Sequence, residues 1–354
     1  RNGGHFGDSA IYFQGAIDKD FAKPTAVTIA SRRLEGFGSV FRRQVGQDNE
    51  TYMLFKLGPG GYRYHRTEGS IILVDSSVPL IYDGGEAGET WRHTTLSFHD
   101  THMPLAPGHI ERSLSLGSVD FAQGVNPEAL KPGDPVFLSD CCEHTLVQKA
   151  FERFNCPTPA NSRSILGVGT DYYILLDELN LPEKTLTHWH LQAVADSHHN
   201  LPDGYLFKGR YGIDLQVTLP GQSFSAVAIN QTPIVDYHKA PEECFSMRHL
   251  QLSAHSPQRI CAILRPVDGN RQLLQVSQQG HVLHVTGEGI DDWHILSHLP
   301  QTINHTAFSF TGRYASIIQR PGRRELCLLD GVSLTADGHT LKTAGNETSA
   351  YQSC

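Results

Sequence analysis

The sequence predicts a mainly β protein whose antiparallel sheets stack into one large super-sandwich. From about residue 36 onward, short runs rich in Val, Ile, Leu, Tyr and Phe alternate with Gly, Pro, Asp and Asn, as in strands joined by turns. A convincing helical spacing of apolar residues occurs in the middle of the chain at one stretch, residues 143–154. This proportion of strand to helix favours stacked antiparallel sheets. The clearest runs are residues 52–56, 70–75, 79–83, 171–177, 215–219, 259–264, 280–285 and 313–318.

The beginning of the chain has a different pattern. Asp8 to Phe21 is compatible with a short helix that Asp8 or Ser9 would cap. The chain starts at Arg1, and we expect it to be a processed or truncated form of a longer protein. The boundary near residue 240 is placed at the stretch Lys239 to Glu243, although strands on its two sides could belong to one sandwich. The expected parts are residues 1–35 as the end of a helical domain with a linker, residues 36–240 as the central β-sandwich, and residues 241–354 as its continuation.

Composition and charge narrow the function classes. Of 354 residues, 39% are hydrophobic and 19% charged, which is typical of a chain that folds throughout. No apolar run reaches the roughly 18 residues that a membrane span needs. The net charge is −8 and Lys and Arg form no block longer than a pair, so we expect no nucleic acid as a partner. Seven cysteines without a CxxC spacing give neither a zinc knuckle nor a clear disulfide framework.

The stretch from Gly61 to His99 contains the residues that point to chemistry. It predicts a hairpin followed by a third strand, with His65 entering the first strand, Asp83 ending the second and His99 on or just after the third. Two imidazoles and one carboxylate suit Zn²⁺ with a fourth position open, and they suit Ca²⁺ less well. The alternative is that both histidines are ordinary strand-end residues and that Asp83 is a turn residue before Gly84. The spacing leaves both interpretations open.

These segments resemble the C-terminal β-sandwich module of the heparinase II/III-like polysaccharide lyases, which are related to the oligoalginate lyases. The resemblance implies a preceding (α/α) toroid, of which residues 1–35 would be a short helical remnant. It also implies a structural Zn²⁺ at the floor of a cleft, bound by His65, Asp83 and His99. The matching positions are His65, the strand 70–74, Pro79-Leu80 with Asp83-Gly84-Gly85, Trp91-Arg92-His93-Thr94, and His99. Looser similarity covers Gly38 to Arg42, Arg163 to Leu166, Asp171 to Asp177 and His188 to His190.

The resemblance implies a lyase that cleaves an anionic polysaccharide containing uronic acid by β-elimination. Such an enzyme would be secreted or periplasmic, would need the missing N-terminal toroid domain as a partner, and could form a homodimer. We expect little activity from this chain alone. A non-catalytic carbohydrate-binding or scaffold module and a uronyl C5-epimerase are the alternatives, since the first needs no turnover and the second shares proton abstraction at C5 with a lyase.

One position departs from the family pattern. Arg63 stands where the family has the first His of an H-x-H pair. Arg keeps its proton and cannot be a base, but its planar fork suits a uronate carboxylate, so we predict a carboxylate clamp. The alternative is a surface Arg between two tyrosines. Tyr64 is the candidate acid for the departing oxygen, and Arg66, Trp91 and Arg92 are the candidates for substrate binding.

If Arg63 clamps the carboxylate with two parallel hydrogen bonds, Arg63→Lys keeps the charge but loses the paired geometry. Activity of the complete enzyme should fall strongly in Arg63→Lys and further in Arg63→Ala. A charge-assisted contact that strengthens in the transition state is worth about 2 to 4 kcal/mol, or about 30- to 1,000-fold in rate. Zinc content and melting temperature should stay near wild type. A kcat/KM within about threefold of wild type for Arg63→Ala would make Arg63 a bystander.

Overall fold

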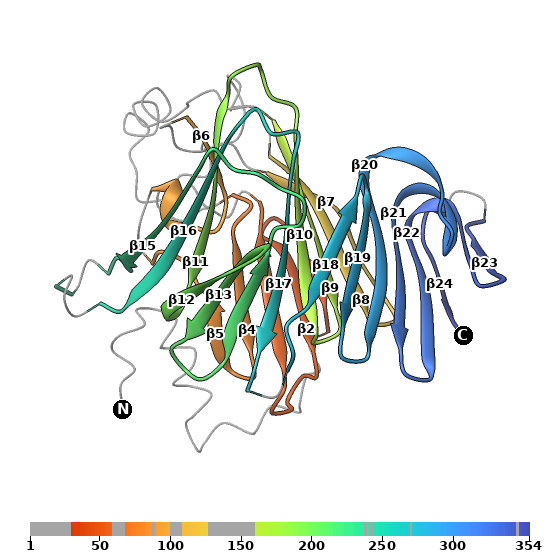
Figure 1. Ribbon diagram of the computed structural model, residues 1–354, viewed down its shortest axis with the longest axis horizontal. Helices are drawn as coiled ribbons and strands as arrows, with labels where there is room; N and C mark the ends of the chain where they lie inside the picture. Colours follow the sequence, from red (N-terminus) through yellow and green to blue (C-terminus); the bar gives the residue numbers. More distant parts are fainter. Residues whose placement is uncertain are drawn as a thin grey trace. The chain divides into compact units, whose positions relative to one another are not determined.

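The computed structural model describes most of the β-sandwich and shows it to be almost entirely antiparallel. The described residues are 30–58, 68–85, 89–99, 108–126, 160–236, 239–240, 244–269, 271–344 and 347–354. Residues 31–354 form one compact unit with three sheets (Figure 1). The two predicted helices, Asp8 to Phe21 and 143–154, lie outside the described residues. Within the described ranges, no helix has the length and apolarity needed to cross a bilayer.

The first sheet has nine strands and carries the region of the predicted site. Along the sheet these are β1 (Arg32–Leu34), β2 (Gly38–Arg43), β3 (Thr51–Lys56), β4 (Ile71–Asp75), β5 (Val78–Ile81), β11 (Leu186–Ala193), β16 (Ser246–His255) and β15 (Ala226–Pro233), while β6 (Leu96–Phe98) pairs with β11. A short 3₁₀ helix, η2 (Thr90–Arg92), precedes β6. The hairpin predicted from the sequence is β4 and β5, which pair through Asp75 and Val78.

The second sheet has eight strands and is the middle layer. Its order is β12 (Ala195–Leu201), β13 (Gly204–Gly209), β14 (Asp214–Thr218), β17 (Arg259–Val267), β10 (Tyr172–Leu179), β9 (Asn161–Val168), β8 (Val119–Asn126) and β7 (His109–Leu116). Strands that precede and follow residue 240 are neighbours in both of these sheets, as in the pairs β11–β16 and β14–β17. The predicted boundary near residue 240 therefore divides the sequence without separating the sheets.

The third sheet has seven strands and contains the end of the chain. Its order is β18 (Gln275–Gln279), β19 (Val282–Gly287), β20 (Ile290–Asn304), β21 (Phe308–Arg320), β22 (Arg323–Ala336) and β23 (His339–Lys342), while β24 (Ala350–Ser353) pairs with β22. All the strand pairs in the three sheets are antiparallel, with bulges in the long strands β20 to β22. The mainly β, super-sandwich prediction is confirmed.

The apolar cores show why β10 reads as an almost continuous apolar run. Tyr173 and Leu175 pack into the core between the nine- and eight-stranded sheets, together with Trp189 of β11. Tyr172 and Ile174 point the other way, into the core between the eight- and seven-stranded sheets. Because alternate residues of a strand face opposite sides, a strand that is buried on both faces needs apolar residues at nearly every position.

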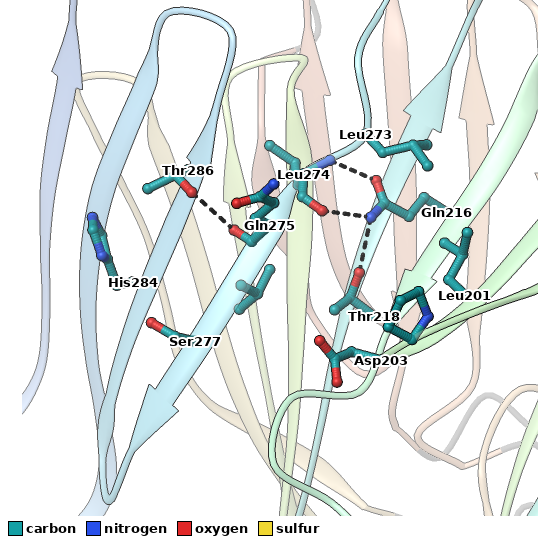
Figure 2. A pocket seen from close by; sticks show the side chains of 12 residues that line it. Leu201, Asp203, Gln216, Thr218, Leu273, Leu274, Gln275, Ser277, His284 and Thr286 are labelled. Atoms are coloured by element: carbon teal, nitrogen blue, oxygen red, sulfur yellow. Dashed lines mark hydrogen bonds between the residues drawn. The ribbon is translucent and has the colours of Figure 1, made fainter.

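The second core also contains two buried cysteines, Cys261 of β17 and Cys327 of β22. At its edge, Gln216 of β14 holds the backbone that leads into β18. Its amide Nε2 donates to the carbonyl of Leu274 at 2.8 Å, and the Leu274 N–H donates to its Oε1 at 2.9 Å (Figure 2). The Gln216 side chain therefore forms with Leu274 the pair of hydrogen bonds that the backbone of a neighbouring strand would form.

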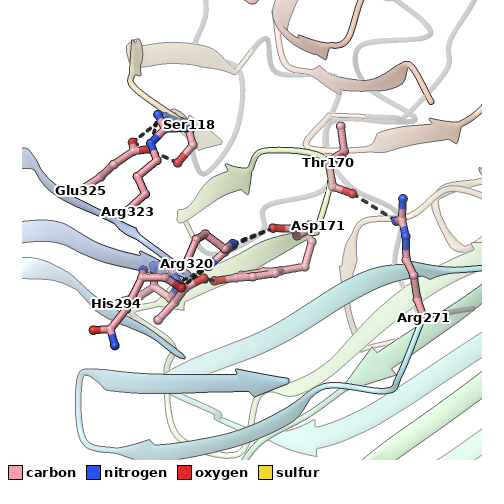
Figure 3. Close-up of polar contacts among 11 residues, drawn as sticks. Ser118, Thr170, Asp171, Arg271, His294, Arg320, Arg323 and Glu325 are labelled. Carbon is pink, nitrogen blue, oxygen red and sulfur yellow. Dashed lines mark hydrogen bonds and ion pairs between the residues drawn. The ribbon is translucent and has the colours of Figure 1, made fainter. Parts of the chain in front are cut away.

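A buried polar network joins the middle sheet to the seven-stranded sheet (Figure 3). The hydroxyl of Tyr172 donates to Asp292 at 2.6 Å and lies 2.7 Å from Nε2 of His294. Arg320 donates to Asp292 and to Asp171, in each case at 2.6 Å. Since the only proton of the Tyr172 hydroxyl goes to Asp292, the imidazole of His294 donates from Nε2 to Tyr172, and its Nδ1 lies 2.9 Å from the hydroxyl of Ser316. Burial favours the neutral form of His294, because it lowers the pKa of this imidazole.

The second contact between these sheets in Figure 3 lies at Glu325, which is buried. Its carboxylate accepts from both the backbone N–H and the hydroxyl of Ser118, at 2.8 and 3.1 Å, and pairs with Arg323. Burying a carboxylate is costly unless it is paired and hydrogen-bonded, and all of these partners reduce that cost.

We predict that His294 makes the sandwich sensitive to acid. Burial lowers the pKa of His294 from 6.5 to about 3, so below pH 6.5 the unfolded chain takes up a proton that the folded chain refuses. His294 contributes its full stabilisation above pH 6.5, the pKa of the group in the unfolded chain. As the pH falls below that value, the free energy of unfolding decreases by about 1.4 kcal/mol per pH unit. Between pH 6.5 and about pH 5 the loss is about 2 kcal/mol.

Urea denaturation of wild type and His294→Gln across this pH window measures the effect. The variant should be less stable at neutral pH, because it disturbs the bonds to Tyr172 and Ser316, but its free energy of unfolding should fall less steeply with acid. Equal slopes in the two proteins would contradict the assignment of this proton to His294.

Candidate functional site

The structure describes four of the predicted site residues. Asp83 follows β5, Trp91 and Arg92 lie in η2, and His99 follows β6. The other four, Arg63, Tyr64, His65 and Arg66, lie outside the described residues, so their predicted roles stay predictions.

The carboxylate of Asp83 lies against His93, a residue that was not predicted as a ligand. Oδ1 of Asp83 pairs with Nδ1 of His93, whose side chain is 0% exposed. The backbone N–H of His93 donates to the carbonyl of Thr90 at 3.0 Å, which closes the 3₁₀ turn. Gly84 makes room for this turn, because a Cβ there would stand 2.5 Å from the carbonyl oxygen of Arg92.

His99 occupies a different environment from His93. It is exposed, its backbone is left-handed with φ of 51°, and its N–H donates to the carbonyl of Leu186 at 2.6 Å. Among the described residues, no group of three His, Cys, Asp or Glu side chains is arranged to hold a metal ion, and His65 is not in that set. The predicted zinc site therefore stays a prediction, with His93 added as a candidate ligand.

Gln192 of β11 fixes η2 on the nine-stranded sheet. Its Nε2 donates to the carbonyl of Trp91 at 2.7 Å, and its backbone N–H donates to the hydroxyl of Thr94 at 3.0 Å. The side chain of Gln192 is fully buried. These two bonds from Gln192 restrict the turn that carries the site residues.

A buried ion pair supports this region from inside the sandwich. Arg163 of β9 and Asp177 of β10 have side chains that are 2% and 0% exposed, and they join through two parallel bonds of 2.7 and 2.8 Å. Nη1 of Arg163 continues to the carbonyl oxygens of Gly69 and Thr94, at 2.5 and 2.9 Å. One guanidinium therefore contacts both chain segments that border the candidate site.

Glu68 lies at the end of the segment that contains Arg63 to Arg66. Its carboxylate accepts the N–H of Gly58 at 3.0 Å, and its carbonyl accepts the hydroxyl of Thr95 at 2.7 Å. Burial raises the pKa of Glu68 to about 7, although the N–H groups of Gly58 and Gly108 oppose the rise. Glu68 thus contacts two neighbouring segments, the one at Gly58 through its carboxylate and the one at Thr95 through its backbone carbonyl.

Three histidines form a row on the face of β11 and β16 that points away from the first core. Nδ1 of His190 lies 3.0 Å from Nε2 of His249, and Nε2 of His190 lies 2.8 Å from the hydroxyl of Ser97. His188 continues the row, with its ring centre 6.0 Å from that of His190. Burial lowers the pKa of His249 to about 4 and that of His190 well below its usual value. His190 and His249 are therefore uncharged at neutral pH and can offer hydrogen bonds but no positive charge.

The predicted substrate-binding residues Trp91 and Arg92 are held together beside this row. The guanidinium of Arg92 lies over the Trp91 ring, 4.4 Å from its centre, and the ring of His249 is 5.6 Å from Trp91. Arg92 also donates to the carbonyl of Pro233 at 3.0 Å, and its side chain is 18% exposed. Arg92 is thus a fixed, partly exposed cation whose Nε lies 3.5 Å from the carboxylate of Glu89, and the Trp91 ring also has partners.

A cavity elsewhere in the sandwich does not fit an anionic polymer. It has a volume of about 570 Å³ and lies between β14 and the edge formed by β18 and β19 (Figure 2). Asp203, Gln275 and His284 are among its lining residues, and no Lys or Arg is among the described residues that line it. Without a cation, this cavity has no means of neutralising a uronate.

Comparisons with known proteins find similarity in structure only. No protein-family model matches the sequence, and no curated protein does. The heparan sulfate lyase HepC from Pedobacter heparinus matches with a TM-score of 0.57 and 16% identity over 79% of this chain and 44% of that chain. The heparinase III encoded by BT4657 matches with a TM-score of 0.54 and 13% identity over 97% of this chain and 45% of that chain. A further heparinase III structure gives a TM-score of 0.52 at 10% identity, over 90% and 42%.

At these identities the comparisons establish the fold, which is shared with heparinase III and heparan sulfate lyase structures. The resemblance predicted from sequence motifs is confirmed at that level. The chain spans less than half the length of the structures that it matches.

Proposed function

We propose that this chain is the C-terminal portion of a polysaccharide lyase that cleaves a uronic-acid-containing anionic polysaccharide by β-elimination. The observation that carries the proposal is the similarity of nearly the whole chain to part of the lyase structures, up to 97% of its length. The contact between Asp83 and His93 supports it, because it joins two motif segments that the resemblance had picked out. The matches cover only 44% and 45% of the two lyase chains, which favours a preceding helical toroid as the missing partner.

The described residues suggest how the chain would contribute to catalysis. The C5 proton of a uronate is weakly acidic, so a cation must neutralise the carboxylate as negative charge develops. Arg92 is fixed by Trp91 and Pro233 and is partly exposed, so the carboxylate of the sugar or of its neighbour would bind it in place of Glu89, its present ion-pair partner. Arg63 and Tyr64 keep the roles of clamp and acid that the sequence predicts. The base would come from the toroid.

We also propose a structural Zn²⁺ that joins these segments. Asp83 and His93 offer a carboxylate and a buried imidazole in contact, which are donors that Zn²⁺ accepts. His65 and His99 are the further ligands that the motif implies. When bound, the ion would crosslink the segments and leave acid and base chemistry to side chains.

A secreted or periplasmic location follows from a substrate of this class, since such polysaccharides lie outside the cytoplasm. A homodimer remains a sequence-based expectation.

The lyase proposal predicts that the full-length protein generates an unsaturated, ultraviolet-absorbing product from a uronic acid polysaccharide. Arg92→Ala should lower kcat/KM by about 10- to 100-fold, because one charge-assisted contact in the transition state is lost. Arg324→Ala, which removes a similarly covered cation from β22, is the matched control and should retain activity. Proton exchange at C5 without cleavage would indicate an epimerase instead. Binding with neither reaction would indicate a carbohydrate-binding module.

The zinc proposal is tested by metal analysis of protein purified without added zinc. We expect near-stoichiometric zinc in wild type and its collapse in His93→Ala, because His93 contacts the Asp83 carboxylate. His99→Ala tests the ligand that the sequence motif predicts. Loss in both variants would assign a four-ligand site, whereas loss in one alone identifies the second imidazole. Wild-type protein free of zinc would refute the site.

A further inference from the structure

We infer that Arg163 is a positioning residue that fixes the two site segments relative to each other from inside the sandwich. The inference rests on the proposed function for its relevance to catalysis, but its physical content is independent. The two segments are the one that ends at Gly69, which contains the predicted residues Arg63 to Arg66, and the one from Thr90 to Thr95, which contains Trp91, Arg92 and His93.

The guanidinium of Arg163 makes four hydrogen bonds in these contacts. Nε and Nη2 form two parallel bonds with Asp177, which also accepts the indole N–H of Trp189 at 3.1 Å. Nη1 donates to the carbonyls of Gly69 and Thr94 at 2.5 and 2.9 Å. The charge is anchored on one side by the middle sheet, and its outer nitrogen connects the two segments.

The carbonyls of Gly69 and Thr94 belong to residues that directly follow Glu68 and His93 in the sequence. His93 is the partner of Asp83. A second bridge runs beside the first, because the hydroxyl of Thr95 donates to the carbonyl of Glu68 at 2.7 Å. Two adjacent bridges between the same segments set both their distance and their relative rotation.

The geometry requires an arginine. Its rigid fork can satisfy both carboxylate oxygens while another nitrogen donates elsewhere, whereas the ammonium of Lys is a compact point charge with three donors on a flexible stem. A Lys at position 163 could pair with Asp177 but could not also hold two carbonyls in the present directions. Arg163 therefore does more than neutralise Asp177, because it also holds the two carbonyls.

The test separates the carbonyl contacts from the ion pair. Arg163→Met with Asp177→Leu removes both buried charges together, an exchange that proteins often tolerate without loss of stability. Arg163→Lys is the second variant, which keeps the charge for Asp177. Hydrogen exchange of the backbone amides of Gly69, His93 and Thr95 reports on the segments, and zinc titration reports on the site.

We expect both variants to fold, with exchange at these amides at least about tenfold faster and zinc bound about 10- to 100-fold more weakly, as when groups that orient metal ligands are removed. The matched control is Arg320→Met with Asp292→Leu, which removes an ion pair between β20 and β21 of the seven-stranded sheet and should leave both measurements unchanged.

Wild-type exchange rates at Gly69, His93 and Thr95 in a folded variant would overturn the inference. If the unmodified protein binds no zinc, the metal proposal fails, and hydrogen exchange alone then decides the role of Arg163.

Discussion

The middle sheet of this protein is covered on both faces, and this constraint governs where charges can be placed. A polar group in such a layer has no access to water, so it must find its partners within the protein. β10 shows the consequence on both of its faces. Asp177 faces the first core and is satisfied by Arg163 and Trp189, while Tyr172 faces the second and is satisfied by Asp292 and His294. Each face of β10 thus carries a polar network within a mainly apolar layer.

The two networks have different consequences for the neighbouring sheets. The network at Tyr172 attaches the seven-stranded sheet and continues through Arg320 to the partly exposed Asp171. The one at Arg163 crosses the first core and reaches carbonyls at the border of the candidate site. A residue of the interior therefore contacts both segments that border the candidate site.

Much of the fold was accessible from the sequence because strand signals are local. The apolar run at 171–177 is β10, and the hairpin at 70–83 is β4 with β5. The site was less accessible, because the sequence suggested an extended segment from Trp91 to His99. The 3₁₀ turn at Thr90–Arg92 interrupts it and brings His93 back to Asp83. A 3₁₀ helix of three residues is too short to give a periodic pattern of apolar residues in the sequence.

The histidine row was missed for a related reason. His188 and His190 alternate along β11 with Trp189 and Leu191, which the sequence indicates as one apolar and one polar face. That the polar face would be buried depends on what covers it, and His249 arrives from a strand about 60 positions further along the chain. Only tertiary structure could supply that pairing.

The buried cysteines of the second core bear on the chemical environment that the protein can tolerate. Burial raises the pKa of the Cys261 thiol to about 12 and that of Cys327 still further. Thiol oxidation and disulfide exchange proceed through the thiolate, which these two groups scarcely form at neutral pH. The sandwich can therefore pass through an oxidising compartment with both sulfurs still reduced, and its stability there does not depend on crosslinks between them.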